Sequence, residues 1–253
     1  MEAEVKRRKR RVVLVALAAC LVVAGIGGTL AWFSAQSQLT NTFTVGKIDQ
    51  PTTEPGNPET PIPDADKTDK LNGNLYEPHW VKDSAIAPNA SVAKDPYVGI
   101  GKDSEPAYTY VYVKNNLPTG AYFMIEQGWA AVDAKTIAGQ SAQYTGGLFA
   151  YTGKDTAGTG TADYDGGKGL ALLEPTANTS GNKEDAWTTT PLFTHIETGD
   201  TYDTSTINST NSTNNDIKVY AYVAAKSGTG DKPEDLNAAA KAWVQEIDPA
   251  PAA

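Results

Sequence analysis

Cysteine and histidine are scarce in this chain, and their scarcity excludes several kinds of catalytic site. Cys20 is the only cysteine among 253 residues and lies in an apolar run, so the rest of the chain has no disulfide, thiolate ligand or cysteine nucleophile. His79 and His195 are the only histidines, and they form no HExxH motif. A zinc protease needs three ligands and a base, and these two histidines show no ligand spacing. We therefore expect both to be ordinary strand residues. No Ser-His-Asp order carries an elbow motif, so we expect no enzyme and assign no catalytic, cofactor-binding or metal-binding residue.

Arginine is absent after Arg11, and acidic residues outnumber basic ones. The formal net charge is −9, from 21 lysines and arginines against 30 aspartates and glutamates. Residues 1–31 hold six of the basic and two of the acidic side chains, so the rest of the chain has a net charge of −13. A chain this acidic, without a basic patch, is not expected to bind nucleic acid. Its acidity and its many Thr, Asn and Ser residues fit a soluble surface outside the cell.

The N-terminal segment, residues 1–32, has the layout of a signal peptide or a membrane segment. Six basic residues precede an apolar run over residues 12–33, as in a secretory signal. This run is also long enough to span a bilayer as a helix. Thr29 and Ala31 are small enough for a signal peptidase site, which predicts cleavage near Ala31 and a mature start at Trp32 or Phe33. Everything after Trp32 is then exported.

Two other fates are open to this segment. An uncleaved segment would anchor the chain in the membrane. The sequence LAAC, which ends at Cys20, resembles the lipobox of a bacterial lipoprotein and would make Cys20 a lipidated N-terminus. The residues after Cys20 stay apolar, however, where a lipoprotein normally turns polar. We therefore prefer a long signal with an internal cysteine.

The rest of the chain divides into a strand-like segment, a linker, one β domain and a tail at 249–253. Residues 33–49 include an alternation around Phe43 and Val45 that predicts a half-buried strand. Residues 50–72 are rich in Pro, Thr, Asp and Glu, and we interpret them as an extended linker. Over residues 73–248, short runs of Val, Ile, Tyr, Phe and Thr between turn residues predict an antiparallel β-sandwich. The predicted strands are 75–81, 92–98, 107–114, 121–127, 148–152, 170–173, 191–196 and 217–225.

Strands 107–114 and 217–225 alternate aliphatic residues with tyrosines. We expect the aliphatic face of each to lie in the core of the sandwich. Tyrosine is a good strand former with a polar tip, so we interpret the tyrosine rows as ordinary strand residues, with an aromatic binding surface as the alternative. One short helix is expected near the C-terminus. Pro233 and Glu234 open it, Asp235 caps it, and its apolar stripe consists of Leu236, Ala240, Trp243 and Ile247.

Three tracts rich in Gly, Thr and Asn predict long polar loops at 153–169, 176–186 and 198–216. A calcium site in these loops is an alternative, because they contain the carboxylates of Asp163, Asp165, Asp200 and Asp203. The EF-hand register fails at Gly167, so we interpret the carboxylates as a solvated acidic loop and expect no cofactor.

Near the N-terminus, a patch of small residues is followed by the motif T-x-A-x-F and then by the motif N-T-F-x-x-G-x-I-D. The matching residues are Gly27, Gly28, Thr29, Ala31, Phe33, Asn41, Thr42, Phe43, Gly46, Lys47, Ile48 and Asp49. This pattern resembles the N-terminal region of the TasA/camelysin family, whose precursors are cut by a dedicated signal peptidase of SipW type. The resemblance continues over about half of the chain in short blocks at 75–80, 87–98, 107–114, 190–193, 217–224 and 242–243.

This resemblance implies a jelly-roll β-sandwich that a Gram-positive-type bacterium exports to form surface or biofilm-matrix fibres. In such fibres an N-terminal strand of one subunit completes the sheet of the next. The candidate donor strand consists of Asn41, Thr42, Phe43, Thr44, Val45, Gly46, Lys47 and Ile48. The implied partners are the signal peptidase, other copies of the chain and, before cleavage, the membrane. The alternatives are a membrane-anchored surface adhesin and a camelysin-like metallo-endopeptidase, although no metal motif here matches the latter.

Overall fold

The computed structural model describes most of the region after residue 47. The described ranges are 33–35, 48–54, 57–63, 70–80, 86–153, 169–175, 187–202, 216–226 and 231–249. The predicted signal segment and most of each predicted loop lie outside these ranges. Among the helical residues that the structure describes, none forms a helix long and apolar enough to cross a membrane.

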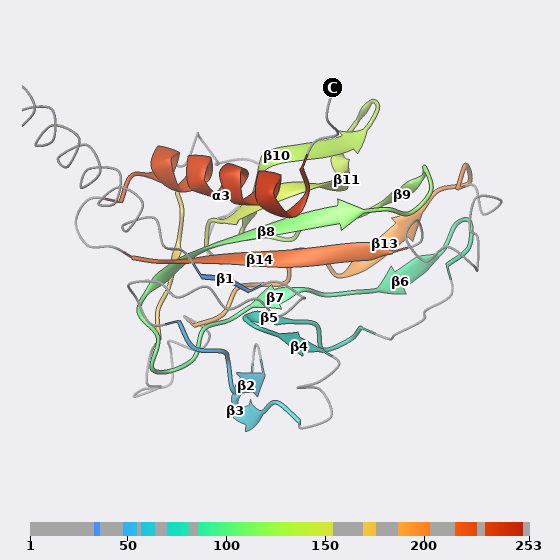
Figure 1. Cartoon of the computed structure of the whole chain (residues 1–253). Coiled ribbons are helices and arrows are strands. Elements are labelled where there is room, and N and C mark those ends of the chain that lie inside the picture. Colours follow the sequence, from blue (N-terminus) through green and yellow to red (C-terminus); the bar gives the residue numbers. More distant parts are fainter. Residues whose placement is uncertain are drawn as a thin grey trace, which may run out of the picture.

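The described residues form strands β1 to β14 and one helix, α3 (Figure 1). The strands are β1 Phe33–Ala35, β2 Thr53–Glu54, β3 Asn57–Pro61, β4 Leu71–Asn72, β5 Leu75–Tyr76, β6 Ser91–Ala93, β7 Tyr97–Val98, β8 Ala107–Asn115, β9 Ala121–Tyr122, β10 Trp129–Ile137, β11 Gln140–Tyr151, β12 Leu172–Leu173, β13 His195–Thr198 and β14 Ile217–Ala225. Helix α3 spans Pro233–Ile247. The predicted all-β class with a short C-terminal helix is therefore confirmed.

A six-stranded antiparallel sheet forms the centre of the molecule. Its strand order is β1-β14-β8-β11-β10, and β12 also pairs with β8. Aliphatic residues and tyrosines alternate along β8 and β14. The register of the two strands places aliphatic residues opposite aliphatic residues and tyrosines opposite tyrosines, and this gives the sheet two different faces. Val111 lies opposite Ala221, and Tyr112 lies opposite Tyr220. One face is thus aliphatic and the other is lined with tyrosines.

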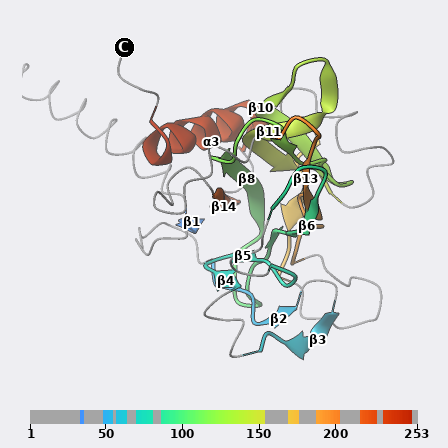
Figure 2. The same cartoon turned by 90° about the vertical axis from the view of Figure 1, so that its right-hand side faces the viewer.

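The aliphatic face forms the main core with two smaller sheets, β4-β5-β7 and β6-β13-β9. Val111, Val113 and Val223 pack there with residues such as Val98 from β7 and Ile196 from β13. Figure 2 shows the small sheets on the side of the large sheet away from α3. The arrangement resembles a β-sandwich, and the prediction that the aliphatic faces lie in its core is correct.

Helix α3 covers the tyrosine face. Leu236, Ala240 and Trp243 are buried, as the predicted stripe requires. The Trp243 ring stacks on Tyr222 with ring centroids 5.1 Å apart, and the Tyr110 hydroxyl donates a 2.9 Å hydrogen bond to Asn237. The tyrosine row therefore faces a helix, and the alternative of an open aromatic surface is wrong for its buried members. The predicted cap is also wrong, because the N-cap residue is Lys232 and no side chain caps the helix.

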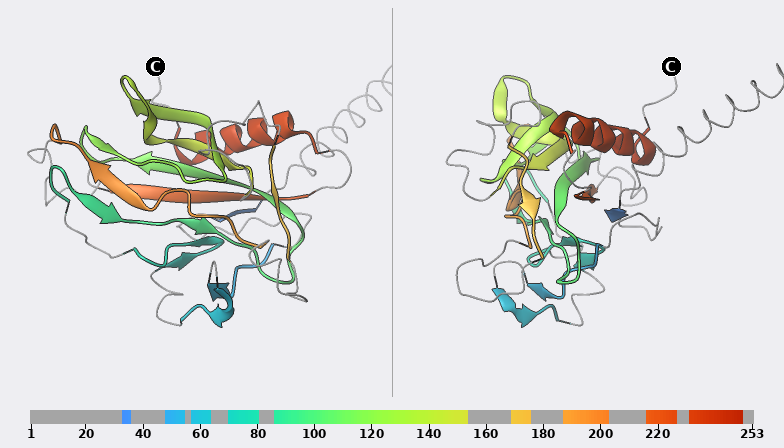
Figure 3. Two further views of the ribbon diagram at one scale, coloured as in Figure 1. Left: turned by 180° about the vertical axis from the view of Figure 1, so that it is seen from behind. Right: turned by 90° about the vertical axis from the view of Figure 1, so that its left-hand side faces the viewer.

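Several predicted strands are shorter than expected. The run 92–98 is split into β6 and β7, because Pro96 has no amide hydrogen for a strand ladder. The range predicted as an extended linker contains the two-stranded β2–β3 sheet, and its Ile62 side chain is only 1% exposed. Figure 3 shows this hairpin at the end of the molecule opposite α3.

Candidate functional site

The outer edge of β14 is the first candidate site. On its inner side, β14 pairs with β8 from Ile217 to Ala225, which is its full length. On its outer side it pairs only with β1, through Val223, Tyr222 and Ala221. Within the described ranges, residues 217–220 and 224–225 of this edge have no neighbouring strand. An edge of this kind can accept a further strand through backbone hydrogen bonds.

Both faces of β14 are already buried beside this edge. Val219 and Val223 contribute to the main core, while Tyr222 and Ala224 pack under α3. A strand added next to β14 would therefore meet apolar surface on the core side and the end of the tyrosine layer on the other. This environment suits a strand with alternating side chains.

The opposite edge of the sheet, β10, has a different character. Its pairing with β11 is interrupted by three register shifts, and Asp133 and Lys135 on this strand are exposed. Bulges and charged residues are devices that keep sheet edges from pairing with other chains. Among the described residues, the sheet therefore has one edge, β10, that is interrupted and charged, and one edge, β14, that has no strand partner over much of its length.

The predicted N-terminal residues are only partly described. Thr29, Ala31, Trp32 and the donor residues from Asn41 to Lys47 lie outside the described ranges. Phe33, which we assigned to the cleavage region, is the first residue of β1 and pairs with Val223.

Ile48, the last donor residue, packs against the main core. The carbonyl of Asp49 accepts hydrogen bonds from the Gly101 amide (2.7 Å) and from the Asn74 side chain (3.0 Å). The Asp49 amide donates to the Ser104 hydroxyl at 2.8 Å. The C-terminal end of the strand-like segment is thus attached to the domain, whereas the sequence suggested that a linker isolates it.

The two histidines lie in different settings. His195 is an exposed residue of β13, as expected. His79 lies in a turn, where its side chain is 75% exposed and its Nδ1 lies 2.6 Å from Oδ2 of the buried Asp95. The prediction that His79 is a strand residue is wrong. Within the described part of the chain, no group of three His, Cys, Asp or Glu side chains is arranged to hold a metal ion.

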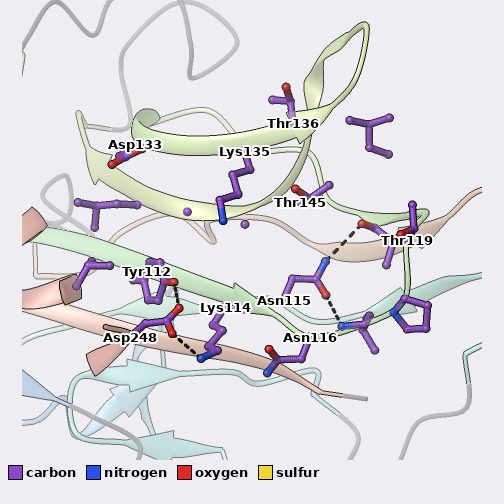
Figure 4. Close-up of a pocket in the computed structure, with 18 of the residues that line it drawn as sticks. Tyr112, Lys114, Asn115, Asn116, Thr119, Asp133, Lys135, Thr136, Thr145 and Asp248 are labelled. Carbon is purple, nitrogen blue, oxygen red and sulfur yellow. Dashed lines mark hydrogen bonds and ion pairs between the residues drawn. The ribbon is translucent and has the colours of Figure 1, made fainter. Parts of the chain in front are cut away.

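A groove of about 910 Å³ is the second candidate site, and Figure 4 shows its lining. The end of β8, residues 116–121, the β10–β11 hairpin and the C-terminal end of α3 line it. Gly146 and Gly147 let the hairpin adopt its shape, with φ angles of +150° and +123°. A Cβ at Gly147 would lie 2.4 Å from the Asp133 carbonyl oxygen, so no other residue fits there without a shift of the backbone.

Asp248 organises one wall of this groove. It accepts a 2.5 Å hydrogen bond from the Tyr112 hydroxyl and a 2.6 Å hydrogen bond from Lys114. Burial alone would raise the pKa of Asp248, but the hydrogen bonds from Lys114 and Tyr112 outweigh it and hold the pKa below its ordinary value. Burial, and then the hydrogen bond to Asp248, raise the pKa of Tyr112, while the bond to Asp248 raises the pKa of Lys114.

Comparisons with protein-family models, curated proteins and solved structures find no match to this chain. None of the residues that line the groove was predicted as a site residue from the sequence. Its one local signal is the Gly146-Gly147 pair inside a strand-like run, which is typical of a bulge or a close approach of two backbones.

Proposed function

We propose that this chain is an exported bacterial surface or biofilm-matrix protein that assembles into fibres by N-terminal strand donation. The observation that carries the proposal is the outer edge of β14, where β1 is the one strand partner among the described residues and pairs with Ala221, Tyr222 and Val223. The proposal also includes cleavage of the signal by a SipW-type peptidase, membership of the TasA/camelysin family and a jelly-roll topology. The resemblance of the N-terminal sequence supports these parts.

The pairing of β1 supports strand donation in a second way. Phe33–Ala35 belongs to the N-terminal segment, and it lies antiparallel to β14 of its own chain. An element that pairs with an edge inside one copy can pair with the same edge of another copy, which is the principle of domain swapping. Residues 33–47 are then the exchanged segment, and the attachment of Ile48 and Asp49 fixes where this segment leaves its own domain.

A deletion of residues 34–47 tests the proposal. It removes β1 after Phe33 and most of the candidate donor strand but leaves Ile48 and Asp49 in place on the domain. We expect the processed wild-type chain to form large, denaturant-sensitive assemblies and the deletion variant to stay monomeric in sedimentation and electron microscopy. A synthetic peptide of residues 33–49 in excess should shorten the wild-type assemblies, because it occupies the β14 edge.

Two controls accompany this test. Deletion of 154–167, an equal length of a Gly- and Thr-rich tract, should leave assembly unchanged, and a scrambled peptide should not shorten the assemblies. Assembly of the 34–47 deletion at the wild-type level would refute strand donation. An uncut monomer confined to the membrane fraction would favour an anchored adhesin instead.

A further inference from the structure

The groove beside α3 is open and rich in side chains that can donate hydrogen bonds. Hydroxyl groups come from Thr136 and Thr145 on the hairpin, and an amide comes from Gln245 on the helix. Apolar stretches, such as Leu117 and Val244, lie between these groups. A site that mixes a few polar groups with apolar surface is typical of ligand pockets, and the open form suits an extended ligand.

Positive charge exceeds negative charge in the groove, although the chain as a whole is acidic. Three ammonium groups, those of Lys114, Lys135 and Lys241, line it together with the carboxylates of Asp133 and Asp248. The whole chain has a net charge of −9. An anion that approaches the chain therefore meets repulsion in general and a local positive excess here.

Lys135 and Lys241 provide this excess. Lys114 is already paired with Asp248 at 2.6 Å. Lys135 and Lys241 form no salt bridge with another residue in the described ranges, although the charge of Lys135 also acts on Asp248. Figure 4 shows the Lys135 side chain extending from the hairpin toward Lys114 and Asp248. An anion in the groove can therefore be held between the hairpin and the helix.

Among the described strands around the groove, none offers a peptide a regular row of free backbone hydrogen-bonding groups. Strands β8 and β11 pair with each other, and the register of β10 is interrupted three times. Recognition must then come from hydroxyl, amide and ammonium groups of side chains. We propose that the groove binds an anionic oligosaccharide, whose hydroxyl groups meet Thr136, Thr145 and Gln245 and whose carboxylates meet Lys135 and Lys241.

Calorimetric titration with short uronate chains tests this assignment. The probes are tetragalacturonate and tetramannuronate, with galactotetraose and mannotetraose as neutral counterparts and tetraglutamate as an anionic peptide. We expect the wild-type chain to bind at least one uronate chain, with an affinity that falls as salt rises, and to bind the neutral chains and tetraglutamate at least tenfold more weakly. The double variant Lys135→Gln/Lys241→Gln should lose about tenfold in uronate affinity, since each exposed ion pair contributes a few-fold.

Lys102→Gln/Lys226→Gln is the matched control. It removes the same charge from two exposed lysines that do not line the groove, so its uronate affinity should stay at the wild-type level. Equal losses in the two double variants would show attraction to the chain as a whole and would overturn the site. Binding of neither uronate, or equal binding of tetraglutamate, would overturn the assignment of the ligand class.

Discussion

Thr109 is a hydroxyl-bearing residue in the aliphatic row of β8, between Ala107 and Val111. It is buried, and its hydroxyl makes no hydrogen bond with any described residue. A buried hydroxyl without a partner costs free energy that an isosteric methyl group does not. We therefore expect Thr109→Val to raise the free energy of unfolding by about 1 kcal/mol, measured by urea denaturation.

Thr188 is the matched control for this substitution. It is equally buried, but its hydroxyl donates to the Val98 carbonyl at 3.2 Å. Thr188→Val should therefore lower the free energy of unfolding by about 1 kcal/mol. A loss of stability in Thr109→Val as well would show that the Thr109 hydroxyl has a partner in solution.

At the scale of elements, Asp248 fastens the C-terminal end of α3 to β8 through Tyr112 and Lys114. The pKa of Asp248 is lower in the folded chain than its ordinary value of 3.8. The stabilisation is therefore fully present well above pH 3.8, and it is lost progressively as the pH falls through 3.8 and then through the lower folded-state pKa. We expect Asp248→Asn to lower the free energy of unfolding by about 1 kcal/mol at pH 7.

The pH dependence distinguishes this tether from a general effect of charge. The difference between Asp248→Asn and the wild type should shrink as denaturation curves are recorded at progressively lower pH. Glu246→Gln removes a charge from an exposed position on the same helix and should match the wild type at each pH. A stability loss in Asp248→Asn that stays constant down to pH 2 would contradict a role for the carboxylate charge.

The sequence predicted well the elements whose side chains pack into one or both of the two hydrophobic clusters. β8, β14 and α3 were predicted within a residue or two, because their alternation or helical stripe contacts the two cores directly. β10 and the first half of β11 were missed. Three register shifts remove the alternation of β10, and its alanines are weak strand formers.

The candidate sites were less predictable than the fold, because segments distant in sequence build them. The groove joins β8, the β10–β11 hairpin and the end of α3, and apart from the Gly146-Gly147 pair no local motif indicates that these elements meet. The attachment of Asp49 to Gly101 and Asn74 also depends on backbone groups, which leave no pattern in the side chains.

At the scale of the whole molecule, the net charge opposes the proposed assembly. The chain after residue 31 has a net charge of −13, so neighbouring copies repel each other, and salt screens this repulsion. We expect fibre assembly, followed by light scattering, to become faster as NaCl rises from about 0.01 to about 0.5 M. Uronate binding in the groove should weaken over the same range.

A less acidic variant separates screening from a general loss of solubility in salt. Asp103→Asn/Glu105→Gln removes two negative charges from exposed positions and should assemble at lower salt than the wild type. An unchanged dependence on salt would contradict the role of repulsion between copies.

The antiparallel pairing of β1 with β14 also determines how a joint between subunits would respond to force. Hydrogen bonds in such a ladder run perpendicular to the strands. When β1 comes from a neighbouring copy and the row of subunits runs along the strands, tension on the row pulls β1 along its own length. The load then falls on all bonds of the ladder together, in shear, whereas peeling would break them one at a time. Since β14 offers nine residues, each further residue that the donated strand pairs makes the joint harder to pull apart.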